Sequence, residues 1–124
     1  MPVNSVLELR IVRLHHGRRN EFAVRFHDQL LPMLRSHGME IIHYGPSLHD
    51  EDSFFLIRAW PSVEERQATL DTMYGGADWL MNQEPYLLDM IHSMDTCVLD
   101  ADEWLIGAMK EGFENEEAMQ DERG

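Results

Sequence analysis

Residues Ser53–Trp60 read S-F-F-L-I-R-A-W, and they decide the fold because they predict a β-strand that is apolar on both faces. Successive side chains of a strand point to opposite sides, and beyond Ser53 one side carries apolar residues: Phe55, Ile57 and Ala59. The other side ends in a guanidinium and an indole: Phe54, Leu56, Arg58 and Trp60. Exposed apolar surface costs about 25 cal/mol per Å². We therefore expect other parts of the protein to cover both faces. The face that carries Arg58 and Trp60 is expected to be buried and also to make polar interactions.

Three further strands and two helices accompany this strand. Alternating apolar residues predict strands over residues 5–14, 39–44 and 93–99. An apolar stripe predicts a first helix that begins near residue 18: Phe22, Phe26, Leu30 and then Met33 or Leu34. This helix should end at His37, because Gly38 suits the left-handed position after a helix, and Pro32 should bend its last turn.

The second helix begins with a capping box, Ser62 followed three residues later by Glu65, and it ends at Gly75-Gly76. Asp78 suits the start of a short helical piece, and Pro85 suits the start of another that runs to Ile91. The order strand, helix, strand, strand, helix, strand is that of the ferredoxin-like α+β fold. We expect a four-stranded antiparallel sheet with both helices on one face.

The way in which the two faces of strand Ser53–Trp60 are oriented predicts that the protein forms an oligomer. If the apolar set of the first strand faces the helices (Leu7, Leu9 and Ile11), then Phe54, Leu56 and Trp60 lie on the opposite face. In a monomer that face would be exposed to solvent, although its residues are apolar. We therefore predict a two-fold homodimer that packs sheet to sheet.

Length and charge bound the domain organisation and the partners. At 124 residues with a net charge of −13, the chain is expected to form one domain over residues 1–100 and an acidic extension over residues 101–124. The extension is expected to hold a short helix over residues 102–110 and to be disordered beyond Phe113. The acidic balance argues against nucleic-acid partners and anionic membranes.

Cysteine usage and hydropathy bound the compartment. Cys97 is the single cysteine, so no internal disulfide can form, and a reducing, cytoplasmic environment is the natural interpretation. No stretch approaches the ~20 apolar residues that a bilayer-spanning helix needs, so we expect no membrane segment. Thr96 and Val98 flank the thiol without a nearby positive charge, which favours an inert, buried cysteine.

Several short motifs together resemble the NIPSNAP family over about residues 6–100: Glu8-Leu9-Arg10, Leu31-Pro32, His37-Gly38, Trp60 with Glu65-Arg66, and Asp78-Trp79. The resemblance implies a dimeric α+β barrel, a group that includes cofactor-independent monooxygenases, haem-degrading monooxygenases and small isomerases. NIPSNAP-like proteins have no well-established general chemistry. Val12 stands where the family pattern has an aromatic residue, which implies a wider and less polar pocket.

The candidate site residues follow from the same strand faces. Glu8, Arg10, Arg58 and Trp60 are expected to share the inner face of the barrel. Either His43 or Tyr44 joins them, which strand parity does not decide, and Trp79 is a further candidate from the resemblance. Guanidinium groups around an apolar cavity suit a small anionic or aromatic ligand. Arg10 and Arg58 would then hold the anion, with His43 or Glu8 as the catalytic base.

Two alternatives stay open for these residues. Glu8 can pair with Arg10 or Arg58 simply to satisfy buried charge, and Trp60 can be core. Whether the protein is an enzyme is likewise open, since an interaction dimer that uses residues 104–113 and the acidic tail fits the sequence too.

We expect no metal and no dissociable cofactor. The seven histidines form no ligand motif such as H-E-x-x-H, and no nucleotide-binding fingerprint is present. A haem site would need a histidine in ligating geometry, and none stands out in the sequence.

Overall fold

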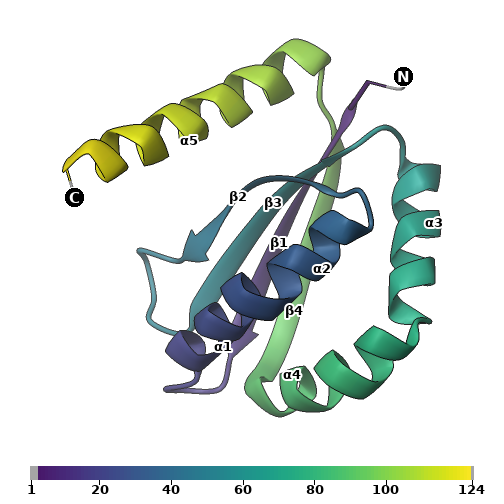
Figure 1. Cartoon of the computed structure of the whole chain (residues 1–124), viewed down its shortest axis with the longest axis vertical. Coiled ribbons are helices and arrows are strands. Elements are labelled where there is room, and N and C mark those ends of the chain that lie inside the picture. The colour runs from purple at the N-terminus through teal and green to yellow at the C-terminus, as the bar shows by residue number, and fades with distance from the viewer. Residues whose placement is uncertain (1–2, 124) are drawn as a thin grey trace.

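A four-stranded antiparallel sheet forms the centre of the computed structural model, which describes the backbone of residues 3–123 and the side chains of residues 3–114 (Figure 1). The strands are β1 (Val6–Leu14), β2 (Glu40–Pro46), β3 (Ser53–Trp60) and β4 (Ile91–Asp100). Their order in the sheet is β2-β3-β1-β4. The two-faced strand β3 is therefore central, between β2 and β1, and the predicted ferredoxin-like α+β fold is confirmed.

The first crossover is one helical rod of three segments: α1 (Arg19–Arg25), the π-helical η1 (Phe26–Leu30) and α2 (Leu31–Ser36). The wider π turn lies directly before Pro32, whose missing N–H and bulky ring are incompatible with a regular α-helical turn there. Gly38 follows the rod with a φ of 80°, the left-handed conformation that the sequence predicted for a helix end.

The second crossover comprises α3 (Val63–Tyr74), the π-helical η2 (Asp78–Gln83) and α4 (Glu84–Met90). Ser62 caps α3, because its hydroxyl accepts a hydrogen bond from the Glu65 backbone N–H at 3.1 Å. The chain turns sharply between α3 and α4, so these helices follow two sides of one corner of the molecule (Figure 1).

The helices cover the sheet face opposite to the one expected. Val6 and Val12 of β1 belong to the core beneath the helices, together with Phe54, Leu56 and Trp60 of β3. The prediction that these β3 residues face a second copy is therefore wrong. Strand parity states which residues share a face, but not which face receives the helices, and both faces of this sheet are apolar.

The other face is covered in part by α5 (Glu103–Arg123) (Figure 1). Ile106, Met109 and Phe113 pack against Leu7, Ile42 and Ala59 of the sheet. Phe113 also stacks on His43, with ring centroids 4.0 Å apart, and Lys110 pairs with Glu40.

This helix is longer than expected. The sequence predicts a helix that ends at Lys110 and disorder beyond Phe113, whereas α5 runs to Arg123. Gly107 and Gly112 each destabilise a helix by about 1 kcal/mol, and packing of the neighbouring apolar residues on the sheet offsets this.

The sheet face near the β1–β4 edge remains uncovered by α5. Leu9 and Ile11 are only half-buried there, and Leu99 is 41% exposed. Cys97 is exposed on β4, so the expectation of a buried thiol is wrong. β4 is an edge strand, and the α5 contacts lie toward β2. Of the helices described, none combines the length and the hydropathy needed to cross a lipid bilayer.

We predict that the Ile106 side chain holds α5 on the sheet. Ile106 is 5% exposed, whereas the neighbouring Leu105 is 40% exposed. Ile106→Ala should weaken the attachment of α5 by about 2 kcal/mol, because it removes a buried side chain, and Leu105→Ala should have a much smaller effect. Hydrogen exchange of the α5 amides measures this, with exchange in Ile106→Ala expected at least about tenfold faster. Equal protection in the two variants would contradict the prediction.

Candidate functional site

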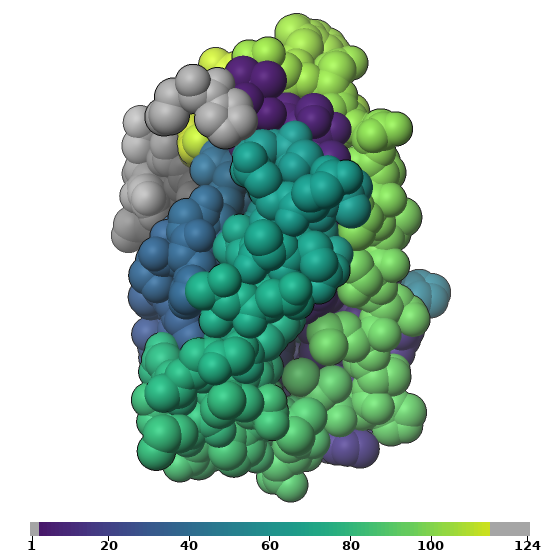
Figure 2. Space-filling model, turned by 90° about the vertical axis from the view of Figure 1, so that its right-hand side faces the viewer, coloured from purple at the N-terminus to yellow at the C-terminus, as the bar shows by residue number. Residues whose placement is uncertain are grey.

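A cavity of about 440 Å³ lies between the helices and the sheet. A hollow in the surface is visible between the α3–α4 segment and β4 (Figure 2). The volume falls in the range of about 300–1,000 Å³ that small-molecule sites occupy. This cavity combines an apolar wall with charged groups, among them the buried Arg58.

One wall of the cavity is aromatic and aliphatic. Phe54 of β3 lies 5.2 Å from the rings of both Phe22 and Phe26 on the first helical rod. Leu56, Met73 and Leu87 extend this apolar surface. Such a wall buries the carbon skeleton of a ligand without offering it hydrogen bonds.

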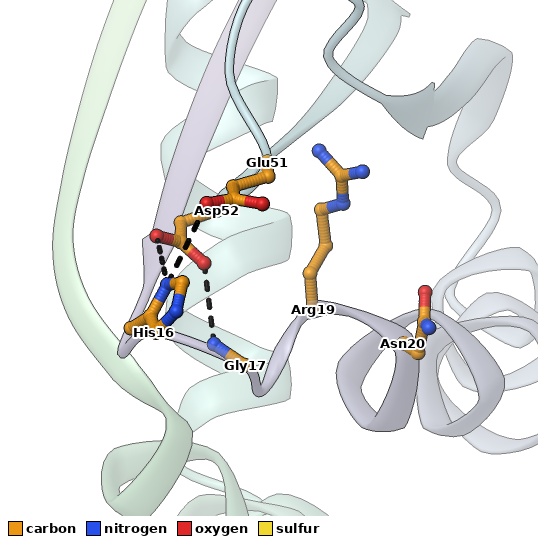
Figure 3. Close-up of a pocket in the computed structure, with 6 residues that line it drawn as sticks. All are labelled: His16, Gly17, Arg19, Asn20, Glu51 and Asp52. Carbon is orange, nitrogen blue, oxygen red and sulfur yellow. Dashed lines mark hydrogen bonds and ion pairs between the residues drawn. The ribbon is translucent and has the colours of Figure 1, made fainter.

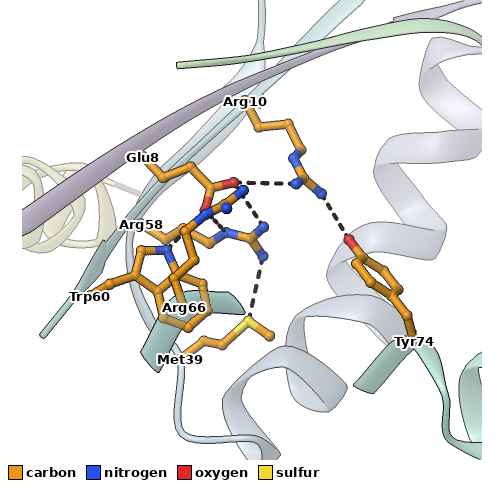
Figure 4. A network of polar contacts seen from close by, with 7 residues as sticks. All are labelled: Glu8, Arg10, Met39, Arg58, Trp60, Arg66 and Tyr74. Carbon is orange, nitrogen blue, oxygen red and sulfur yellow. Dashed lines mark hydrogen bonds and ion pairs between the residues drawn. The ribbon is translucent and has the colours of Figure 1, made fainter. Parts of the chain in front are cut away.

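A charged network centred on Glu8 adjoins the cavity, and its Arg10 and Arg58 are part of the cavity lining (Figure 4). The Glu8 side chain is fully buried, and Arg58, its partner across the β1–β3 ladder, donates to it through Nε at 3.0 Å and Nη2 at 2.9 Å. Trp60 Nε1 donates to Glu8 Oε1 at 2.9 Å, and Arg66 Nε donates to the same oxygen at 2.8 Å. Arg10 Nη2 lies 3.4 Å from Glu8 Oε2.

This network keeps Glu8 ionised. Burial alone raises the pKa of the Glu8 carboxyl, but hydrogen bonds from Arg58 and Arg66, together with the charges of the neighbouring arginines, lower it from 4.5 to about 2. Both carboxylate oxygens are engaged by these donors. The geometry therefore makes Glu8 an anchor for the arginines, and it leaves no oxygen to act as a base.

Arg10 connects this network to the cavity. Its Nη1 donates to the Tyr74 hydroxyl at 2.9 Å, and its Nε is buried without a hydrogen-bond partner among the described residues. Three guanidinium groups surround one carboxylate, which leaves an excess of two positive charges. A buried charge excess with an unpaired donor is a place where an anion binds favourably.

A second polar pair lines the cavity next to Tyr74. The Tyr74 and Trp79 rings meet edge to face with centroids 4.8 Å apart, and Trp79 Nε1 donates to Glu84 Oε2 at 2.9 Å. Tyr74 ends α3, Trp79 belongs to η2 and Glu84 begins α4, so the sharp turn after Gly75-Gly76 brings them together.

The structure brings some of the sequence candidates together and separates others. Arg10, Arg58 and Trp79 line the cavity, whereas Trp60 is buried beside Glu8, outside the cavity lining. Tyr44 faces the helices and packs on Phe26 with centroids 4.9 Å apart, also outside the lining.

His43 lies on the α5 face of the sheet, so it does not reach this cavity, and the proposal of His43 as its base is wrong on geometric grounds. A β-bulge between Ile41 and His43 shifts the alternation of side chains in β2. Simple parity could not reveal that shift.

Sequence reasoning assigned no role to Tyr74, Glu84 or Arg66. An available signal was the tyrosine directly before the Gly75-Gly76 break with a tryptophan five residues after that tyrosine. The reach of Arg66 from α3 to β1 depends on tertiary structure alone.

A separate cluster lies on the surface where β1 ends (Figure 3). His16 Nδ1 lies 3.1 Å from Asp52 Oδ2 and 3.9 Å from Glu51 Oε1. The hydrogen bond to Asp52 raises the pKa of His16 above its ordinary value. His16 and Glu51 are exposed, and Arg19 adds a positive charge to the same hollow. This arrangement is explained by a solvated ion pair at a turn.

Comparison with known proteins identifies the fold. No protein-family model and no curated protein sequence matches the chain. A NIPSNAP family protein with unknown function from Agrobacterium tumefaciens superposes with a TM-score of 0.73 at 19% identity, over 83% of this chain and 93% of that one. An uncharacterized NIPSNAP-like domain protein from Burkholderia xenovorans gives 0.70 at 17% identity, over 76% and 82%.

More distant structures share the same architecture. A putative antibiotic biosynthesis monooxygenase from Nitrosomonas europaea superposes with a TM-score of 0.61 at 11% identity, over 82% of this chain and 93% of that one. The resemblance to NIPSNAP proteins that the motifs indicated is thus confirmed at the level of the fold. At sequence identities of 11% to 19%, the structural similarity shows a shared fold and nothing more specific.

We predict a pH dependence of stability that belongs to Glu8. Its pKa is lower in the folded chain, so its contribution is complete above about pH 4.5 and is lost as the pH falls toward 2. Between pH 5 and pH 2 the wild-type protein should lose about 3 kcal/mol of unfolding free energy more than Glu8→Gln does.

Urea unfolding at a series of pH values measures this difference. The exposed Glu64→Gln of α3 is the matched control and should follow the wild-type curve. Parallel curves for wild type and Glu8→Gln would contradict the assignment.

Proposed function

We propose that the cavity binds a small organic molecule that has an apolar, often aromatic, body and an anionic group. The observation that carries this proposal is the buried Arg10 Nε without a partner among the described residues. It belongs to a network with two positive charges in excess. An anion at Arg10 would satisfy the donor and offset the charge.

The rest of the cavity supports the same class of ligand. The same cavity is lined by Phe22, Phe26 and Phe54, whose rings suit a flat or branched hydrocarbon group. Arg58 is 1% exposed and is held by Glu8 and by Met39 Sδ, so it orients the network behind Arg10. Arg10 is then the guanidinium that meets the ligand.

An enzymatic form of this proposal is a cofactor-independent oxidation, and the chain shares its fold with putative antibiotic biosynthesis monooxygenases. In such chemistry the bound substrate supplies electrons to dioxygen, and the protein supplies a dry pocket and donors for the substrate anion. Arg10 and Tyr74 are the donors that this cavity offers.

We also propose that a second copy covers the part of the sheet that α5 leaves open. Leu9, Ile11 and Phe55 are half-buried there, and Leu99 is exposed beside them on β4. A two-fold pairing would bury these residues. The alternative of an interaction protein that uses its C-terminal helix has one supporting observation, the 78% exposure of Trp104.

We expect carboxylates to bind more tightly than their neutral analogues, through Arg10. Phenylacetate should bind at least about tenfold more tightly than phenylacetamide, because a charge-assisted hydrogen bond contributes about 1.5–3 kcal/mol. Arg10→Met should abolish this difference. Isothermal titration calorimetry with both compounds measures it.

The matched control for Arg10→Met is Arg13→Met. Arg13 lies on the same strand, and its exposed side chain pairs with Asp95. This variant should bind like the wild type. If no carboxylate of this size binds, or if Arg10→Met binds as the wild type does, the proposed function is wrong.

The dimer is tested by two substitutions on β4. Leu99 and Val98 are adjacent residues on opposite faces of the sheet, and they are 41% and 37% exposed. Leu99→Glu should convert a dimer into a monomer, because it places a charge within the apolar interface, and Val98→Glu should leave the dimer intact. Sedimentation velocity at micromolar concentration measures both. A wild-type monomer would refute the dimer.

A further inference from the structure

Two polar pairs on the cavity wall differ in chemical character and lie next to each other. Arg10 and Tyr74 form a pair of donors, and Trp79 and Glu84 form a donor–carboxylate pair. The edge-to-face contact of Tyr74 with Trp79, at 4.8 Å between centroids, joins the pairs. Arg10, Tyr74, Trp79 and Glu84 all line the cavity, so one ligand can contact both.

The first pair keeps at least one unengaged donor on each side chain. The Tyr74 oxygen accepts from Arg10 Nη1, and among the described residues its own O–H has no acceptor. The Nε–H of Arg10 is unpartnered as well. Two donors fixed by their mutual hydrogen bond are the arrangement that stabilises negative charge developing on a substrate oxygen.

The second pair offers a carboxylate oxygen. Glu84 Oε2 accepts from the Trp79 indole at 2.9 Å, whereas Oε1 has no hydrogen-bond partner among the described residues. Glu84 is half-buried and, among the described residues, has no arginine partner, in contrast to Glu8. A carboxylate that one neighbour orients, and whose other oxygen is unengaged, is suited to accept a proton from a bound molecule.

We propose that Glu84 and the Arg10–Tyr74 pair form a proton-transfer site for small 2-oxo acids, catalysing keto–enol interconversion at the carbon next to the carbonyl. A 2-oxo acid presents two adjacent oxygens, and the pair presents two donors, so the carboxylate fits Arg10 Nε and the carbonyl oxygen fits the Tyr74 hydroxyl. The inference rests on the proposed function, because the acid must first bind in the cavity.

The step is balanced without any co-reactant. Glu84 Oε1 takes a proton from the carbon next to the carbonyl, and the electron pair of that C–H bond forms a C=C bond. The carbonyl π pair moves onto oxygen, where the Tyr74 O–H stabilises it. Return of the proton from Glu84 to that oxygen yields the enol, and return to carbon regenerates the keto form. In heavy water the second route exchanges the C–H for C–D.

A purely structural role of Glu84 is the competing interpretation, in which the carboxylate only holds the Trp79 indole. Glu84→Gln separates the two roles. The amide oxygen of glutamine still accepts from the indole, but glutamine accepts no proton at neutral pH. The matched control is Glu103→Gln, since Glu103 is an exposed glutamate in the first turn of α5, just as Glu84 stands in the first turn of α4.

The test uses phenylpyruvate as the probe, because it combines a 2-oxo acid with a benzylic CH₂ group. Deuterium exchange of that group in heavy water is followed by proton NMR above the buffer background, and binding is followed by calorimetry. Glu84→Gln should slow the catalysed exchange by about 10²–10⁴-fold while binding stays within about threefold of the wild type. Glu103→Gln should match the wild type, and Tyr74→Phe should slow exchange by about 10²-fold.

The outcomes separate this inference from the proposed function. If the wild type binds phenylpyruvate but does not accelerate exchange, or if Glu84→Gln exchanges as fast as the wild type, the proton-transfer site is wrong and ligand binding stands. If the wild type binds neither phenylpyruvate nor phenylacetate, both proposals fall. Should Glu84→Gln not fold, Glu84→Asp and Tyr74→Phe decide, since each must slow exchange in a protein that still binds.

Discussion

The structure depends on one buried carboxylate. Glu8 has no exposed surface, and an ionised group in that position is stable only when donors replace the water it has lost. Arg58 and Trp60 supply those donors from β3, and Arg66 supplies one from α3. A single side chain therefore ties the central strands to the second crossover helix, and it sets the positions from which the cavity is built.

The network that stabilises Glu8 also leaves an excess of positive charge and an unused hydrogen-bond donor. Satisfying one carboxylate needs fewer than three guanidinium groups, yet Arg10 is held beside it with a donor unused among the described residues. A local departure from complete pairing in an otherwise well-packed core is typical of a functional site. Here the unpaired donor belongs to Arg10, which lines an apolar cavity between the helices and the sheet, so a bound ligand can accept its hydrogen bond.

Some features of the site were accessible from strand parity. Alternation in β1 and β3 placed Glu8, Arg10 and Arg58 on one face, and the antiparallel register sets Glu8 opposite Arg58. The same reasoning could not choose between His43 and Tyr44, because a β-bulge in β2 breaks the alternation, and bulges depend on the packing of neighbouring strands. It could not find Tyr74 or Glu84 either, since their proximity to Arg10 arises from a turn between two helices.

The sequence by itself determined the order of the elements, the helix ends before Gly38 and at Gly75-Gly76, and the two-faced character of β3. These follow from local periodicity and from the backbone preferences of glycine, proline and capping residues. Only the tertiary structure decided which face of the sheet the helices cover and how α5 shares the other face. In an isolated strand the two apolar faces are equivalent, because nothing within the strand distinguishes them. The choice between them is made by packing against helices that are distant in the sequence, and that choice places Arg10 in the cavity and His43 outside it.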